Sequence, residues 1–220
     1  MAYFKIITGP MFSGKTEELI RLLHRSQIAG KKILVVKPKI DIRTQNEIAS
    51  RKKEDLQNGG FKKFMEFPAI PVSSAEEIAA LIDSRQPDVL GLDEAQFFEP
   101  WIFEFVHALL HKHADSDLLI LAAGLDMDAW GKPFGSMPQL LAIANEVQKE
   151  TAICFSCKQA GTITQKLVNT GKTVEVGDAE IYEARCRKCH TMPEEAVQPQ
   201  AFDFVKVDSA ANNPQISEVI

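Results

Sequence analysis

The sequence predicts an α/β fold with a mainly parallel sheet flanked by helices, followed by a small C-terminal domain of a different kind. Three observations support this prediction. Short apolar runs alternate with helix-like segments over the first 150 residues, a pattern typical of a parallel sheet covered on both faces. A glycine-rich motif follows the first apolar run. All four cysteines lie beyond residue 150.

The first part of the chain contains two predicted strands with a helix between them. The run "YFKIIT" (3–8) is rich in β-branched and aromatic residues and ends in a glycine-rich turn, which predicts a buried strand. Apolar residues recur at helical spacing over 15–29, and a glycine then ends the predicted helix. A second buried strand is predicted at "KILVVK" (32–37). Residues 39–66 are polar and charged, so we expect a mobile loop or insertion there.

Two further helices and two further strands follow. The sequence "SAEE" (74–77) has the form of a capping box and predicts a helix that runs to about Ser84. The apolar run "DVLGLD" (88–93) predicts a third strand. Pro100 suits the first turn of the next helix, which has an apolar face. The run "DLLILAAGLD" (117–126) predicts a fourth strand.

The pattern of the sequence changes near residue 150, which indicates a domain boundary. We expect residues 1–150 to form the main domain and residues 151–192 to form a smaller domain that carries the cysteines. A hairpin is predicted around residues 169–171 of this smaller domain. The composition of residues 193–220 is polar and irregular, which predicts a disordered tail.

The composition and charge of the chain argue against several classes of protein. Of its 220 residues, 45% are hydrophobic and 25% are charged, which is typical of an ordinary globular protein. The net charge of −5 gives no support for a broad surface that binds nucleic acid. The first residues do not resemble a signal peptide, and no apolar stretch reaches the roughly 18 residues of a membrane helix. We therefore expect a cytoplasmic protein without nucleic-acid or membrane partners.

A phosphate-binding loop is predicted between the first strand and the first helix. The sequence "GPMFSGKT" fits the pattern G-x-x-x-x-G-K-[ST], in which backbone N–H groups and a helix N-terminus face phosphate oxygens. Lys15 can reach the β- and γ-phosphates of ATP, and the Thr16 hydroxyl can bind Mg²⁺. These features predict a P-loop NTPase-like fold. The predicted phosphate-binding residues are Gly9, Pro10, Met11, Phe12, Ser13, Gly14, Lys15 and Thr16.

Two adjacent carboxylates end the third predicted strand, in the sequence "VLGLDEAQFF" (89–98). An apolar strand that ends in an aspartate beside the phosphate loop predicts that Asp93 contacts magnesium. Successive side chains of an extended segment point to opposite faces, so Glu94 is expected to serve another partner. That partner is water in an ATPase and a substrate hydroxyl in a kinase. This motif alone does not distinguish the two.

The two Cys-x-x-Cys pairs predict a structural zinc site. In a reducing compartment such pairs favour a metal over a disulfide, and four thiolates complete the tetrahedron that Zn²⁺ prefers. The segment between the pairs (158–185) is longer than the roughly 15–20 residues of a compact zinc ribbon. Zinc is therefore expected to clamp the base of a long loop that can close over a ligand. The predicted ligands are Cys154, Cys157, Cys186 and Cys189.

Several sequence blocks together resemble the type II (cellular-type) thymidine kinase family. "GPMFSGKT" resembles its phosphate loop, and "DEAQFF", "GLDMDAWGKPFG" and "VEVGDAEIYEARCRKCH" resemble later blocks in the same order. The resemblance runs from the first strand through His190. It implies an enzyme that transfers the ATP γ-phosphate to the 5′-hydroxyl of thymidine or deoxyuridine, giving dTMP and ADP in pyrimidine deoxynucleoside salvage. It also implies Mg²⁺, structural Zn²⁺ and a homotetramer.

The resemblance further implies roles for individual residues. Glu94 would be the general base that takes the proton from the nucleoside 5′-hydroxyl. The residues placed near the triphosphate and the metal are Asp41, Arg43, Asp93 and Gln96. The residues that match nucleoside-pocket positions are Phe97, Leu125, Phe134, Thr164, Val176, Gly177 and Tyr182. Several of these lie in the long loop held by zinc. In the family this loop is called the lasso. Ala129 stands where the family usually has phenylalanine.

Two alternatives to a kinase remain open from the residues alone. The first is a P-loop ATPase whose zinc module binds nucleic acid, although the acidic composition argues against it. The second is an interaction module in which the nucleotide site acts only as a switch. Phosphate transfer to a nucleoside would distinguish a kinase from both. His107 and His111 lie four residues apart on a predicted helix without a third ligand, so we expect a solvated helix end there.

Overall fold

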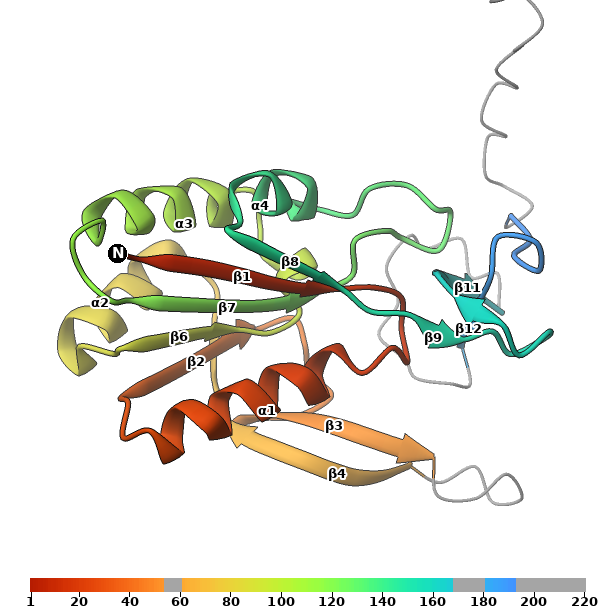
Figure 1. Cartoon of the computed structure of the whole chain (residues 1–220), viewed down its shortest axis with the longest axis horizontal. Coiled ribbons are helices and arrows are strands. Elements are labelled where there is room, and N and C mark those ends of the chain that lie inside the picture. Colours follow the sequence, from red (N-terminus) through yellow and green to blue (C-terminus); the bar gives the residue numbers. More distant parts are fainter. Residues whose placement is uncertain (54–60, 168–180, 193–220) are drawn as a thin grey trace, which may run out of the picture.

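A six-stranded parallel sheet forms the centre of the molecule (Figure 1). The computed structural model describes residues 1–53, 61–167 and 181–192. The strand order is β5-β2-β6-β7-β1-β8, and every neighbouring pair is parallel. All carboxyl ends therefore meet at one edge, where ligands of such sheets bind. The strands are β1 (Tyr3–Thr8), β2 (Ile33–Pro38), β5 (Ile70–Val72), β6 (Val89–Leu92), β7 (Leu119–Gly124) and β8 (Glu146–Lys149).

Helices cover both faces of the sheet, as the sequence predicted (Figure 1). Alternate residues of β1 face opposite cores. Phe4 and Ile6 join the core under α2, α3 and α4, whereas Ile7 joins the core under α1. Among the helices of the described ranges, none combines the length and the apolar character needed to cross a membrane. The helices are α1 (Lys15–Ile28), α2 (Ala75–Arg85), α3 (Trp101–Lys112), α4 (Met137–Ile143) and the short 3₁₀ helix η1 (Ala95–Phe97).

Of the mobile loop or insertion expected at residues 39–66, the structure favours the insertion, because much of that segment is folded. An antiparallel hairpin forms there from β3 (Glu47–Lys53) and β4 (Phe61–Pro68). Ile48 and Phe67 face each other across the hairpin and are buried in the core under α1. Burial alternates along the start of β3, where Ile48 and Ser50 are buried and Glu47 and Ala49 are partly exposed, as expected when one face of a hairpin is covered. The high overall polarity of the segment hid this alternation.

The cysteine-bearing segment adds two small antiparallel pairs beyond the main sheet (Figure 1). One pair consists of β9 (Ala152–Ile153) and β10 (Ala160–Gly161), and the other of β11 (Ile163–Lys166) and β12 (Tyr182–Arg185). The hairpin expected around residues 169–171 lies outside the described residues, and so does the tail that we expect to be disordered.

Candidate active site

The phosphate loop connects the carboxyl end of β1 to the first turn of α1, as the sequence predicted. Its glycines adopt backbone conformations that other residues rarely adopt, with φ of 144° at Gly9 and 86° at Gly14. Two side chains of the loop donate hydrogen bonds to the same carbonyl oxygen. Ser13 Oγ donates to the oxygen of Pro10 at 2.9 Å, and Lys15 Nζ donates to the same oxygen at 2.6 Å. The N–H groups of the first turn of α1, which lack helical partners, can bind phosphate oxygens.

Gly9 leaves no room for a side chain, which gives a first testable prediction. A Cβ atom on this residue would lie 2.3 Å from the carbonyl oxygen of Glu150. Because φ is also positive, Gly9→Ala is expected to lower the free energy of unfolding by about 1–3 kcal/mol and to weaken ATP binding by about tenfold or more. Thermal melting and ATP titration measure the two effects.

Gly30→Ala is the matched control for this prediction. Gly30 also has a positive φ, of 74°, but a Cβ atom there would meet nothing within 4 Å. It lies beyond the C-terminal end of α1, away from the phosphate loop. The control should therefore lose some stability and retain its affinity for ATP. Equal ATP affinities of the two variants would show that the phosphate loop tolerates a side chain at Gly9.

Asp93 follows β6 and contacts the phosphate loop through Thr16. The Thr16 hydroxyl donates to the carboxylate and lies 3.3 Å from Oδ1 and 3.4 Å from Oδ2. Burial, together with the charge of Glu94, raises the pKa of Asp93 to about 7. Burial also lowers the pKa of Lys15, although nearby carboxylates oppose this effect. The hydroxyl and carboxylate oxygens suit Mg²⁺, and a cation here would relieve the repulsion between the two carboxylates.

Glu94 is held by two side chains from different segments. Its backbone turns sharply between β6 and η1, with φ of 51°. Arg43 Nη2 forms an ion pair with Glu94 Oε1, and Gln96 Nε2 donates to Glu94 Oε2 at 2.5 Å. Gln96 Oε1 in turn accepts a hydrogen bond from the N–H of Leu125 at 2.9 Å. The Glu94 side chain is 14% exposed, so a carboxylate of fixed orientation remains accessible and can accept a proton from a hydroxyl group.

The loop after β2 brings Asp41 and Arg43 to the same place. Arg43 Nε donates to Asp41 Oδ1 at 2.6 Å, so the guanidinium bridges the carboxylates of Asp41 and Glu94. Burial disfavours the charged guanidinium, but the charges of Glu94 and Asp41 outweigh it and raise the pKa of Arg43. Burial also acts against the charged form of Asp41, yet Arg43 and Lys37 hold the pKa of this carboxyl below its ordinary value. Arg43 is therefore a cation suited to binding phosphate.

Three residues predicted to line the nucleoside pocket lie on η1 and on the loop after β7. Phe97 of η1 packs edge-to-face against Phe134, with ring centroids 5.6 Å apart. Leu125 is buried at the end of β7. The loop approaches η1 closely at Gly135, where a Cβ atom would lie 2.4 Å from the carbonyl oxygen of Gln96. Three predicted pocket residues are thus brought beside the segment that carries Glu94.

The other predicted pocket residues come from the cysteine-bearing segment. The hydroxyl of Thr164, on β11, accepts a hydrogen bond from the N–H of Met11 at 3.0 Å, which links this segment directly to the phosphate loop. Tyr182 is buried on the neighbouring strand, β12. Val176 and Gly177 lie outside the described residues.

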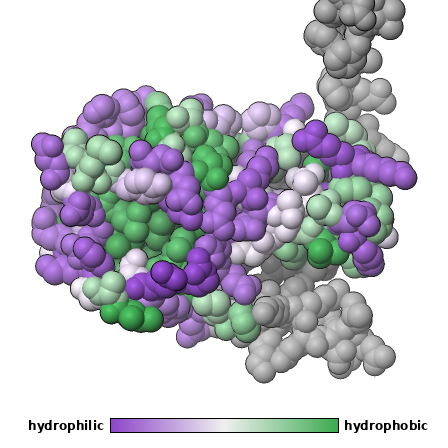
Figure 2. Space-filling view, viewed as in Figure 1, coloured by the Kyte–Doolittle hydropathy of each residue, from purple (hydrophilic) through white to green (hydrophobic). Residues whose placement is uncertain are grey.

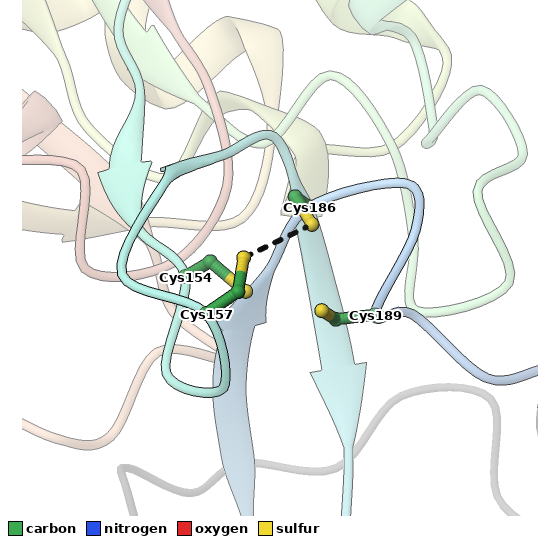
Figure 3. A group of neighbouring side chains, drawn as sticks. All are labelled: Cys154, Cys157, Cys186 and Cys189. Atoms are coloured by element: carbon green, nitrogen blue, oxygen red, sulfur yellow. Dashed lines mark hydrogen bonds between the residues drawn. The ribbon is translucent and has the colours of Figure 1, made fainter.

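The four cysteines predicted to bind zinc lie together, with their sulfur atoms directed toward a common point (Figure 3). All four Sγ atoms lie within 4.8 Å of one another, and those of Cys157 and Cys186 are 3.6 Å apart. A tetrahedral zinc ion with Zn–S bonds of about 2.3 Å separates its sulfur ligands by about 3.8 Å. The cluster therefore fits a four-thiolate zinc site.

The electrostatics of the cluster also favour a cation. A backbone hydrogen bond from Cys157 lowers the pKa of Cys154 to about 6, whereas hydrogen bonding with the sulfur of Cys186 raises the pKa of Cys189 to about 12. Such divergent pKa values are expected when several thiols crowd together and cannot all ionise. A bound divalent cation would stabilise four thiolates at once.

We expect reduced protein to contain about one zinc ion per chain. Elemental analysis of freshly purified protein measures this content, and thiol titration gives an independent reading. The four thiols should react slowly before chelation and rapidly after it, because a coordinated thiolate is a poor nucleophile while it is bound. A zinc content below about half an equivalent in undamaged protein would contradict the four-thiolate site.

Two further contacts in this region were not predicted from the sequence. Asp126, just after β7, forms an ion pair with Lys149 in which Nζ and Oδ2 are 2.6 Å apart, and its charge also acts on Lys15. Like Asp93, it follows a buried apolar strand, so the same reasoning could have found it. His190 Nε2 donates to the carbonyl oxygen of Ala129 at 2.9 Å. Nothing in the sequence indicated this link between the cysteine-bearing segment and the loop after β7.

The fold and this site define a P-loop phosphotransferase, in which an oriented carboxylate lies beside a phosphate-binding loop. Comparison with known proteins gives the family. The family model for thymidine kinase matches residues 2–190 of the chain. A thymidine kinase of Mycoplasma mobile is 42% identical over 192 residues, which cover 87% of this chain and 88% of that protein. The chain belongs to the thymidine kinase family. It is therefore an ATP-dependent kinase, which decides against the two alternatives.

Proposed function

We propose that this kinase transfers the γ-phosphate of ATP to the 5′-hydroxyl of thymidine or deoxyuridine, giving dTMP and ADP for pyrimidine deoxynucleoside salvage. One observation carries the proposal. The carboxylate of Glu94 lies at the carboxyl edge of the sheet, oriented by Arg43 and Gln96. This carboxylate adjoins Asp93, which contacts the phosphate loop. Membership of the thymidine kinase family supports the choice of nucleoside.

The proposed phosphate and metal site consists of the loop from Gly9 to Thr16 together with Asp93. The backbone N–H groups of the loop and the ammonium of Lys15 bind the β- and γ-phosphates. Thr16 and Asp93, already in contact, hold Mg²⁺, which neutralises charge on the phosphates when bound. Arg43 contributes positive charge beside the triphosphate while its guanidinium keeps its contacts with Asp41 and Glu94. Phosphoryl transfer depends mainly on such positioning and charge stabilisation.

Glu94 is the proposed general base. Its carboxylate accepts the proton of the 5′-hydroxyl as the oxygen attacks the γ-phosphorus in line with the departing ADP. Gln96 keeps one carboxylate oxygen in a fixed orientation, because its own amide is anchored on the N–H of Leu125. The base is thus positioned through hydrogen bonds that do not change during the reaction.

The proposed nucleoside pocket lies between the loop after β7 and the cysteine-bearing segment. Its proposed residues are Phe97, Leu125, Phe134, Thr164, Val176, Gly177 and Tyr182. Zinc bound by the four cysteines is structural, since four thiolates leave no open coordination position. We propose a kinase domain at residues 1–150 and a zinc and lasso domain at 151–192. Thiolate ligands of this kind are maintained in a reducing compartment, which supports action in the cytoplasm.

We also propose that the protein is a homotetramer, as in its family. Figure 2 shows an apolar area, in green, on the face that lies over the sheet. Leu22, Val89, Leu119 and Leu121 contribute apolar surface to a groove near the C-terminal end of α1, which is also lined by charged residues such as Arg25 and Asp88. Contiguous apolar surface of this kind favours self-association. Sedimentation equilibrium distinguishes a tetramer from a monomer.

The proposed function is tested by ADP release from Mg-ATP with and without thymidine. Deoxycytidine and single-stranded DNA serve as controls in the same assay. Strong stimulation by thymidine, with dTMP formed in equal amount to ADP, is the expected result. Stimulation by DNA alone, or turnover of ATP without any acceptor, would mean that Glu94 activates water and would contradict the proposal.

A further inference from the structure

A buried lysine outside the predicted site begins a polar network that ends on Glu94. Lys37 is the last residue but one of β2, and its side chain is fully buried, with 0% exposure. A lysine is rarely buried to this degree unless its charge is paired, since transfer of an isolated ammonium from water is very unfavourable. None of the sequence motifs accounts for a charge at this position.

The ammonium of Lys37 is satisfied entirely by the loop that follows β2. Its Nζ atom lies 3.3 Å from Asp41 Oδ2 and 2.8 Å from Thr44 Oγ1, and it also donates to the carbonyl oxygen of Thr44. A lysine has three donors, and each has a partner here. The Thr44 hydroxyl donates onward to the carbonyl oxygen of Glu47 at 2.5 Å. Lys37 therefore fixes the loop between β2 and β3 against the sheet.

The carboxylate of Asp41 connects Lys37 to the active site. Its Oδ2 atom faces Lys37, and its Oδ1 atom accepts a hydrogen bond from Arg43 Nε at 2.6 Å. Arg43 then forms its ion pair with Glu94. Arginine has a long, flexible side chain, so its guanidinium needs a fixed partner to keep one orientation. Asp41, which is itself held by Lys37, is that partner for Arg43. The network joins the carboxyl ends of β2 and β6.

We propose that Lys37 is a positioning residue for phosphoryl transfer. It orients Asp41, which orients Arg43 against Glu94 before the substrates bind. The inference rests on the proposed role of Glu94 as general base. A group aligned in advance needs no rearrangement in the transition state, and misalignment by about 1 Å can reduce turnover by about 100-fold. Lys37 acts through Asp41 and Arg43 rather than on the reacting atoms.

Lys37→Met tests the proposal, because methionine keeps much of the length of the side chain and removes its charge. We expect kcat to fall by about tenfold or more, while KM for thymidine changes by less than about threefold. The matched control is Lys39→Met, the same substitution at an exposed residue of the same loop. This control should retain wild-type kcat. Wild-type kcat in Lys37→Met would overturn the proposal.

A double-mutant cycle with Arg43→Gln separates positioning from a purely structural role. If Lys37 acts through Arg43, Lys37→Met should reduce kcat little further in the Arg43→Gln background. Loss of thermal stability, in contrast, should be similar in both backgrounds. An equal reduction of kcat with and without Arg43 would overturn the proposal, because Lys37 would then act by another route.

A milder variant keeps the proposal testable where Lys37→Met does not fold. Thr44→Val removes one of the three acceptors of the ammonium and leaves its charge paired with Asp41. A smaller fall in kcat, again with little change in KM, is expected, and wild-type kcat would overturn the proposal. If the wild-type protein did not phosphorylate thymidine, the proposed function would be contradicted instead. Failure of the positioning role and failure of the proposed function are therefore distinguishable.

Discussion

Replacement of Glu94 by glutamine is expected to reduce kcat for thymidine phosphorylation by about 10²–10⁴-fold, the usual contribution of a general base. Glutamine has nearly the same shape, and Asp41 still holds Arg43, so the site should keep its geometry. ATP should bind as well or better, because a negative charge beside the triphosphate is removed. Thymidine-dependent ADP release measures kcat, and titration calorimetry measures ATP affinity.

Glu99→Gln is the matched control for Glu94→Gln. Glu99 lies five residues further along the chain and is exposed. The control should show wild-type turnover, since it removes the same charge without touching the network around Glu94. Near-normal turnover of Glu94→Gln would remove Glu94 from its proposed role. The next candidate would then be Asp126, a buried carboxylate whose charge acts on Lys15, as do the charges of Glu94 and Asp93.

The central part of the fold and of the site could be predicted because its signals are local. Apolar residues predominate in each short strand of the sheet's interior, and the phosphate loop has a fixed spacing between strand and helix. Parallel strands place their carboxyl ends together, so Asp93 could be assigned to the edge that carries the phosphate loop. The four cysteines are likewise brought together, as their two Cys-x-x-Cys pairs predicted.

The elements that the sequence did not indicate depend on tertiary contacts. Strand β8 is short and polar, and it is recognisable as a strand only from its pairing with β1. Sequence reasoning treats a lysine as exposed, so the burial of Lys37 could not be foreseen. The contact between Arg43 and Glu94 joins loops more than 50 residues apart in the sequence. Such contacts follow from loop conformation, for which short motifs carry little information.

Loss of the zinc site is expected to impair nucleoside binding far more than ATP binding. Metal binding supplies folding free energy to small thiolate sites, so the cysteine-bearing segment should lose its order without zinc. That segment carries Thr164 and Tyr182, and His190 of the same segment supports the loop at Ala129. The phosphate loop, in contrast, is built on β1 and α1. Among the hydrogen bonds of the described residues, it would lose the one from Met11 to Thr164, which contributes about 1 kcal/mol.

Cys186→Ser is therefore expected to abolish stoichiometric zinc and to raise KM for thymidine by about tenfold or more, while ATP affinity falls by no more than about fivefold. The fivefold limit on the loss of ATP affinity corresponds to the loss of one hydrogen bond. The larger effect on KM for thymidine reflects the loss of several contacts in the nucleoside pocket. Zinc analysis, thymidine kinetics and ATP titration measure the three quantities. Lys188→Ser, in the same Cys-x-x-Cys turn but exposed, is the control that keeps all four thiolates. Equal losses of thymidine and ATP binding would mean that zinc supports the whole fold rather than the nucleoside pocket.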